Sequence, residues 1–550
     1  MNKILSILGF EDIKAFLLRY VIPIIVLDLL MLFAFNYFFE DFYLRLLGYF
    51  VCVSILFVSG YYPFMILGKQ SKEIEQTLHF FITYAGALST VNLERKEMFT
   101  DLSKKVRYLE IANAFKKLMY LVDNIKLDFS TASYKISNLY ATPHFSRFLE
   151  RMGIALSFNS SVSSFFLQEQ VALMNSYAVV YKEGLERIKV LQDMFSSLIM
   201  AFSFVLATIL LMPFLTGIDG TYFLKFGVLG VIVIDVMMVL FAKSFIPKDK
   251  LYQDIWDDGR IKIMYMFLIA ITISLFLSPV VFIMDMKMSL KIAIICTPLL
   301  IVGIYSNYQE KLVWRRDILF PAFIRSLGNV HQSKGGTLTT TVETLLPHNF
   351  GMLNSMLERV YKRLKITKDK FNSWYFFSKE SGSALISEFM DIFVTVVYRG
   401  GSAEVAGQIV SDNMSRINGL RDMKREYVSS LKGSLYGSFF SLALTVYISL
   451  LISGLLLSIF SSMTTDISGE AADMISGIFP MDMNSDMGGS TSYVAIIMAV
   501  HAFACGFMLK IVDGGNYFSL LRESVIMLWL GAILEIGIVY IFAQMFGTYL

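Results

Sequence analysis

The sequence has little of the chemistry that cysteine and histidine supply. It contains three cysteines and five histidines in 550 residues. Cys52, Cys296 and Cys505 form no CxxC pair, so we interpret them as small buried residues and expect neither a disulfide framework nor a thiolate metal site. The histidines are scattered and form no HExxH motif. We therefore expect no bound metal and no cofactor.

The sequence also lacks a nucleotide-binding loop. Neither glycine-rich stretch, SKGGTL (333–338) or YRGGSAEVAG (398–407), has the GxxxxGK[ST] spacing that cradles phosphates. Both are typical of turns between helices, where glycine supplies a positive φ. In the second stretch Ser402 is placed to cap the next helix with its hydroxyl. No Ser/His/Asp grouping can be argued from the spacing, so the sequence predicts a protein that is not an enzyme.

Charge is scarce as well, and long apolar runs take its place. Charged residues make up 17% of the chain, against about 25% in soluble domains. The mean hydropathy is +0.60. Nine runs approach the roughly 20 apolar residues that cross a bilayer, which predicts an all-α polytopic membrane protein. The predicted spans are 21–39, 46–67, 196–217, 223–245, 263–284, 289–308, 437–461, 493–512 and 524–548.

Two charged blocks, 68–195 and 309–436, interrupt these spans. The expected organisation is an N-terminal segment with two spans (1–67), block 68–195, four spans (196–308), block 309–436, and three spans (437–550). The blocks hold 16 and 18 Lys and Arg, whereas loop 462–492 holds none and carries five acids. The positive-inside rule then puts the N-terminus and both blocks in the cytoplasm, and the acidic loop and C-terminus outside the cell membrane.

Each block reads as an antiparallel helical bundle. Apolar residues at 78, 81, 82, 85 and 88 follow the spacing of one helix face. A constant offset of 242 (320 − 78) lays Phe81 on Phe323, Ile82 on Ile324 and Gly86 on Gly328, and brings the following spans into phase. The sequence therefore predicts a tandem repeat of a cytoplasmic bundle followed by membrane helices.

Three acids, Asp28, Asp235 and Glu535, fall within predicted spans. Charge in a bilayer is unfavourable, so each should face the bundle interior and be paired or protonated. An ion pathway is one interpretation. We favour contacts between helices, in which Asp235 or Glu535 meets Lys225, His501, or a serine or threonine.

Basic residues gather at several places in the two blocks. Positive-inside bias and contact with anionic lipid account for some of them. The others suit an acidic protein partner, because complementary charge raises the association rate and fixes register. No nucleic-acid-binding fold is evident. The candidate docking residues are Arg325, Arg399, Lys424 and Arg425, followed by Lys362, Arg363 and Lys365.

Two stretches carry a resemblance to a known family: FPAFIRSLGNVHQSKGGTLTTTVETLL (320–346) and YRGGSAEVAGQIVSDNMSRINGLRDMKREY (398–427). With the tandem bundles, they resemble the inner-membrane platform family of type IV pilus and type II secretion machines (GspF/PilC/TadC-like). The size, the nine spans and the acidic loop are most similar to its archaellum-platform (FlaJ/ArlJ) group. The first copy departs from the pattern, since SFNSSVSSFF (157–166) has no glycine pair.

The resemblance implies a passive adaptor at the base of a filament. Its partners would be a cytoplasmic hexameric ATPase, pilin-like subunits (archaellins) and other motor accessory proteins, with a homodimer plausible. ATP-driven movement would assemble the filament and rotate it. The alternatives are a platform for an adhesive pilus, a secondary transporter built from repeats, and an enzyme with an intramembrane site.

Overall fold

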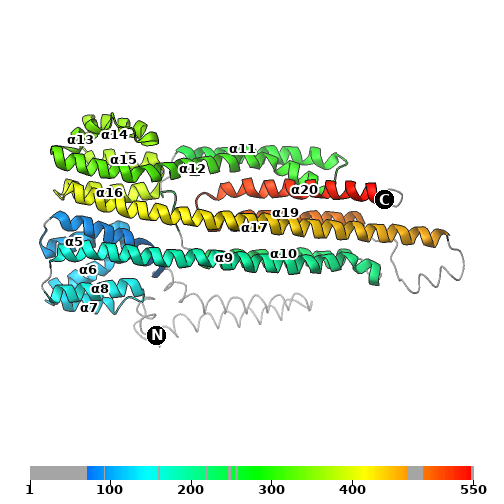
Figure 1. Cartoon of the computed structure of the whole chain (residues 1–550), viewed down its shortest axis with the longest axis horizontal. Coiled ribbons are helices and arrows are strands. Elements are labelled where there is room, and N and C mark those ends of the chain that lie inside the picture. Colours follow the sequence, from blue (N-terminus) through cyan, green and yellow to red (C-terminus); the bar gives the residue numbers. More distant parts are fainter. Residues whose placement is uncertain are drawn as a thin grey trace, which may run out of the picture. The chain divides into compact units, whose positions relative to one another are not determined.

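The computed structural model describes residues 71–546, except for 92, 159–160, 217–219, 246–248, 254–257 and 467–486. The predicted spans 21–39 and 46–67, with Asp28, lie outside the described residues. Within the described part the chain is helical and has no β-strand, as Figure 1 shows. A single isolated antiparallel bridge there joins Tyr252 and Ser383. The predicted all-α membrane fold is confirmed.

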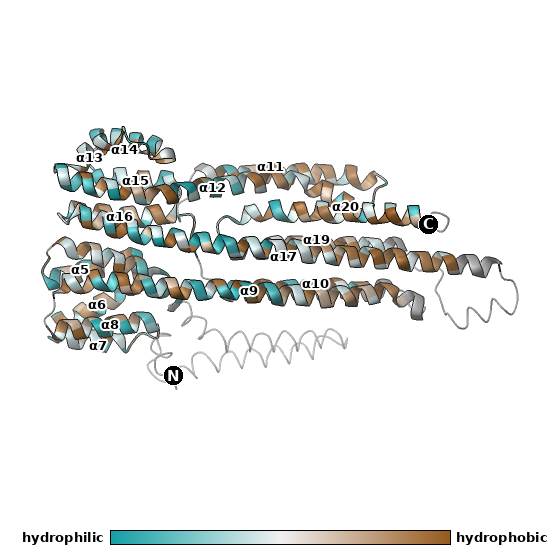
Figure 2. Ribbon diagram, viewed as in Figure 1, coloured by the Kyte–Doolittle hydropathy of each residue, from teal (hydrophilic) through white to brown (hydrophobic). Residues whose placement is uncertain are grey.

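Seven of the described helices are long and apolar enough to cross a membrane. They include every described residue of the seven spans predicted beyond residue 195 except Met284, and Figure 2 shows long apolar stretches along α10, α11 and α20. Their bounds are α9 Val162–Thr216, α10 Gly220–Phe245, α11 Asp258–Ile283, α12 Met288–Lys334, α17 Ala403–Asp466, α19 Met487–Asp513 and α20 Leu520–Phe546.

The chain forms two compact units, Met1–Met174 with Thr395–Ile409, and Asn175–Val394 with Val410–Leu550. In the first, a helix over residues 71–88 begins a bundle whose core is rich in phenylalanine. Phe115 lies between Phe81 and Phe99, with ring centroids 5.1 and 5.9 Å away. The other elements are η2 Ser89–Val91, α5 Arg95–Lys104, η3 Val106–Tyr108, α6 Leu109–Asp123, α7 Phe129–Ser137, α8 Pro143–Ser157 and the start of α9.

The YRGGSAEVAG stretch belongs to this first unit, although it falls within the predicted block 309–436. Helix α16, Ala384–Tyr398, ends just before Gly400, whose φ is 83°. The Ser402 hydroxyl then accepts a hydrogen bond from the Val405 backbone N–H at 3.3 Å, as the sequence predicts for a capping serine. A Cβ on Gly401 would lie 2.9 Å from Thr90 Oγ1, so only glycine permits this close approach.

The second unit combines a soluble bundle with the apolar helices. Its bundle contains the later part of α12, then α13 Leu338–Leu345, η4 Gly351–Leu353, α14 Asn354–Ile366, α15 Lys370–Ser381 and most of α16, with 410–436 of α17. Phe323 packs against Phe377, with ring centroids 6.0 Å apart. Among the apolar helices, α12 packs on α11 and α20, and α10 packs on α19.

Helices α12 and α17 run without a break from the bundle into the apolar region. Helix α12 has 47 residues and includes the predicted span 289–308. Helix α17 has 64 residues and includes the predicted span 437–461. Ser434 of α17 shares a 2.7 Å hydrogen bond with Ser196, so α9 and α17 lie side by side here.

Candidate functional site

A buried arginine network lies where the bundle of the second unit meets its apolar helices. Arg421 of α17 donates to both oxygens of Asp249, at 2.6 and 2.8 Å, and to Asp317 of α12 at 2.9 Å. The Arg421 side chain is 6% exposed and that of Asp317 is 0% exposed. Asp317 also accepts a hydrogen bond from the Ser383 hydroxyl. We call these four residues the arginine network.

The network fixes the loop between α10 and α11 to the bundle. Asp249 begins a stretch whose backbone pairs with the α15–α16 turn: Ala384 N–H donates to Leu251 at 3.0 Å, and Gln253 N–H to Gly382 at 3.3 Å. The Gln253 side chain donates to the Lys379 carbonyl at 2.7 Å. A movement of this turn would therefore pull on the loop and on the two apolar helices that the loop joins.

Burial sets the electrostatics of the network, which lies beyond the apolar runs 289–308 and 437–461. Desolvation raises the pKa of Asp317 to about 6, although Arg421 acts in the opposite direction. Arg421 balances two carboxylates and also donates to the Lys250 carbonyl at 3.0 Å. A charge pair this well buried is sensitive to the loss of one partner.

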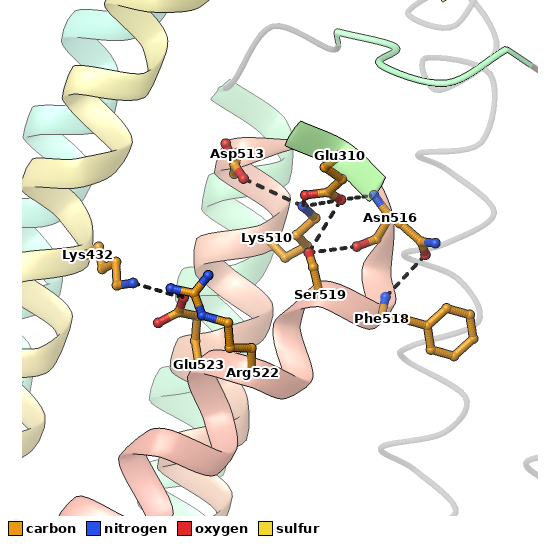
Figure 3. Close-up of polar contacts among 9 residues, drawn as sticks. All are labelled: Glu310, Lys432, Lys510, Asp513, Asn516, Phe518, Ser519, Arg522 and Glu523. Atoms are coloured by element: carbon orange, nitrogen blue, oxygen red, sulfur yellow. Dashed lines mark hydrogen bonds and ion pairs between the residues drawn. The ribbon is translucent and has the colours of Figure 1, made fainter. Parts of the chain in front are cut away.

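A second group of buried charges, the lysine cluster, lies where the end of α19 and the start of α20 meet the middle of α12 (Figure 3). Lys510 of α19 contacts both oxygens of Glu310 of α12, at 2.8 and 2.9 Å. Glu310 also accepts from the Asn516 backbone N–H at 2.6 Å, and Asp513 lies 3.5 Å from Lys510. Beside the cluster, Lys432 of α17 donates to Glu523 of α20 at 2.9 Å. Ionic contacts thus join α12 to α19 and α17 to α20, just outside the predicted spans 289–308 and 437–461.

The intramembrane acids have partners of the kind expected. His501 Nδ1 lies 3.1 Å from Asp235 Oδ1. Glu535 accepts a hydrogen bond from Ser289 and lies 3.8 Å from the Lys287 ammonium. Cys505, interpreted from sequence as merely apolar, also contacts His501, with Sγ 3.6 Å from Nε2. Among the described residues, no group of three or more His, Cys, Asp or Glu side chains is arranged to hold a metal ion.

The first four predicted docking residues have differing environments. Arg325 pairs with Asp412 at the surface, and the exposed Arg399 pairs with Asp101, whose side chain is 11% exposed. Lys424 is 4% exposed, and burial lowers its pKa even though Asp249 and Asp513 oppose this effect. The Arg425 guanidinium stacks 3.7 Å from the ring centroid of Trp314. An exposed docking role does not fit Lys424, which forms part of the packed junction.

The other three docking candidates lie together on α14. Lys362 is exposed and has no ion pair among the described residues. Arg363 pairs with Glu380, which also accepts from Arg359 at 2.7 Å. Lys365 lies 3.6 Å from Glu343. Burial raises the pKa of Glu380, but the hydrogen bonds from the two arginines lower it more, so the net pKa lies below its usual value.

The main participants of the two buried groups escaped the sequence analysis. Asp249, Asp317, Glu310 and Lys510 come from three segments, because Glu310 and Asp317 share α12, and nothing in their local spacing marks them as partners. A weak signal was present, since each lies within about ten residues of a predicted span end. A single charged residue near the end of a predicted span is a candidate for an ion pair with a residue on another helix.

Comparison with known proteins identifies relatives along nearly the whole chain. Flagella accessory protein J of Methanocaldococcus jannaschii is 29% identical over 553 residues, which cover 97% of this chain and 96% of the relative. The protein of the same name from Methanococcus voltae is 27% identical over 539 residues, 95% of each chain. No family model matches the sequence, and no solved structure matches it. Because both alignments run almost from end to end, the chain is similar along nearly its whole length to two archaeal flagella accessory proteins J.

Proposed function

We propose that this chain is the membrane platform on which an archaellum is assembled, and that it passes on the movement of a cytoplasmic ATPase. The two relatives are named as flagella accessory proteins, which supports a role in the same apparatus. In this proposal both bundles face the cytoplasm. A hexameric secretion-type ATPase binds them, and pilin-like subunits are taken from the membrane into the filament.

One structural observation carries the transmission step. Helices α12 and α17 extend unbroken from the bundle into the apolar region, and the arginine network ties the α10–α11 loop to the same bundle. A displacement of the bundle reaches the apolar helices through packed helices and buried ionic contacts. A flexible linker at residues 308–309 or 436–437 would absorb such a displacement.

The proposal is tested by binding and by motility. The full chain, purified in nanodiscs, should bind the cytoplasmic secretion-type ATPase hexamer of its own organism. Deletion of the gene should remove the filament and swimming, and the wild-type gene should restore both. Absence of binding together with normal swimming would refute the proposal. Loss of surface adhesion with swimming intact would instead favour a platform for an adhesive pilus.

A further inference from the structure

Each bundle has a turn between two helices that carries an exposed isoleucine. The α6–α7 tip (residues 124–128) reads NIKLD, and the α14–α15 tip (365–369) reads KITKD. In each, an isoleucine is followed by lysine and then by an aspartate that caps the next helix. Asp128 accepts from the Thr131 N–H and Asp369 from the Asn372 N–H, both at 3.0 Å. Ile125 and Ile366 each lie three residues before the capping aspartate, Ile125 in the turn after α6 and Ile366 as the last residue of α14.

Both isoleucines are exposed although nothing in the turn requires an apolar residue. Ile125 is 53% exposed and Ile366 is 85% exposed. In the first tip the next residue, Lys126, has a φ of 61°, a left-handed conformation that no other non-glycine residue adopts in the described part of the chain. Side chains with a Cβ are strained there, and such strain persists where the surroundings fix the backbone. The α6–α7 tip is thus a fixed structure that holds an aliphatic side chain in water.

Exposed lysines lie close to both isoleucines. Lys126 in the first tip, and Lys362 and Lys368 beside the second, are exposed and make no ion pair with any described residue. The nearby acids are already used: Asp123 pairs with Lys96 at 2.7 Å, and Asp128 and Asp369 cap helices. A complementary surface would be acidic around a small apolar pocket, which is the usual arrangement of an anchor residue with a polar rim.

A lipid surface does not fit the α14–α15 tip. The Arg316 guanidinium on α12 donates to the carbonyl of Ser381, at the end of α15, at 2.9 Å, and Phe377 packs on Phe323 farther along α12. Helix α15 therefore runs back along α12, with its Lys370 end farthest from the apolar run 289–308. At 1.5 Å per residue, Phe323 is already about 22 Å beyond that run, and the start of α15 is farther still. A membrane surface at that run is therefore out of reach of this tip.

We propose that the two tips are equivalent binding elements and that Ile125 and Ile366 insert into the same acidic-rimmed pocket on two subunits of one homo-oligomeric partner. The inference rests on the proposed function, which supplies such a partner in the ATPase hexamer. Each subunit of a homo-oligomer carries one copy of the pocket. Two different subunits can therefore bind the two isoleucines of one chain. The two contacts then act together, because the second contact forms at a high effective concentration.

Charge-introducing variants of the full chain in nanodiscs test this proposal. The variants are Ile125→Asp, Ile366→Asp and the double variant, with the ATPase hexamer as analyte in biolayer interferometry. Each single variant should raise the apparent Kd at least about tenfold, and by similar factors, because it reduces two contacts to one. The double variant should show no measurable binding. Leu139→Asp is the matched control, because Leu139 is also 53% exposed and lies in the same bundle as Ile125.

The outcomes separate this inference from the proposed function. Wild-type binding with an unchanged apparent Kd in either single variant would overturn the equivalence of the tips and leave the platform role intact. An equal loss in Leu139→Asp would overturn it as well, because the effect would then be general to added charge. A wild-type chain that does not bind the hexamer would overturn both. Circular dichroism and the melting temperature establish that each variant is folded, as expected for exposed positions.

Discussion

The arginine network gives the sharpest prediction, because it can be broken by one substitution. Arg421→Leu removes the guanidinium that contacts Asp249 and Asp317 and leaves two carboxylates facing each other in a buried site. Removing one partner of a buried ion pair destabilises proteins by about 3–5 kcal/mol, since the remaining charge is neither solvated nor balanced. We expect the free energy of unfolding to fall by this amount at pH 7.

The measurement is equilibrium unfolding in mixed micelles, followed by intrinsic tryptophan fluorescence, with a matched control. Arg325→Leu removes the same kind of side chain from an ion pair whose partners, Arg325 and Asp412, are 44% and 53% exposed. An exposed pair contributes about 0–1 kcal/mol. The two arginine variants should therefore differ by at least about 2 kcal/mol, which is the gap between these two ranges.

A further variant separates loss of pairing from loss of packing. Combining Arg421→Met with Asp317→Asn neutralises the fully buried carboxylate and keeps Asp249 as a countercharge for Lys424, so it should recover much of the stability lost in Arg421→Leu. If Arg421→Leu and Arg325→Leu have equal effects, the network is not a buried ionic structure and the reasoning fails.

Two further predictions concern the bundle and the apolar helices. Because the folded pKa of Glu380 lies below its unfolded value of about 4.3, its ion pairs stabilise the protein above that pH and the effect is lost as the pH falls through the folded pKa. Glu380→Gln should therefore lower the free energy of unfolding by about 1 kcal/mol at pH 7. The melting temperatures of the wild type and the variant should become equal near pH 3. A difference in melting temperature that does not change with pH would contradict the ionic explanation. A Cβ at Gly303 would lie 2.8 Å from the Arg522 Cα of α20, so Gly303→Ala should force α12 from α20 and destabilise by about 1–3 kcal/mol. Gly537→Ala is the control, because its Cβ would meet nothing within 4 Å, and it should be neutral or slightly stabilising. If Gly303→Ala and Gly537→Ala change the free energy of unfolding equally, the close approach of α12 and α20 is unimportant.

Much of the fold could be predicted because membrane insertion and helix periodicity are local signals. The spans beyond residue 195, the buried face at Phe81, Ile82 and Ala85, and the cap at Ser402 all depend on residues within one or two turns. The continuous α12 and α17 were not predicted. Their hydropathy changes abruptly near residues 308 and 436, but a helix tolerates such a change because its hydrogen bonds are satisfied internally in either environment.

The candidate site was far less predictable, because its contacts are long-range. Lys424 lies in the same polar stretch as exposed residues, and only the approach of the α10–α11 loop and α19 encloses it. Asp249 and Arg421 are 172 positions apart, so no pattern within a window could pair them. The tips at Ile125 and Ile366 were visible as sequence, but their significance depends on exposure, which the local pattern does not give.

The length of α17 has a mechanical consequence. From residue 410 to 466, a stretch that lies within one unit, the helix is about 85 Å long at 1.5 Å per residue. As a rigid lever, it would convert a tilt of about 5° at one end into a shift of about 7 Å at the other. A shift of that size exceeds the pitch of one helical turn. A small rotation at one end of α17 would therefore be enough to change which side chains are in contact near its other end.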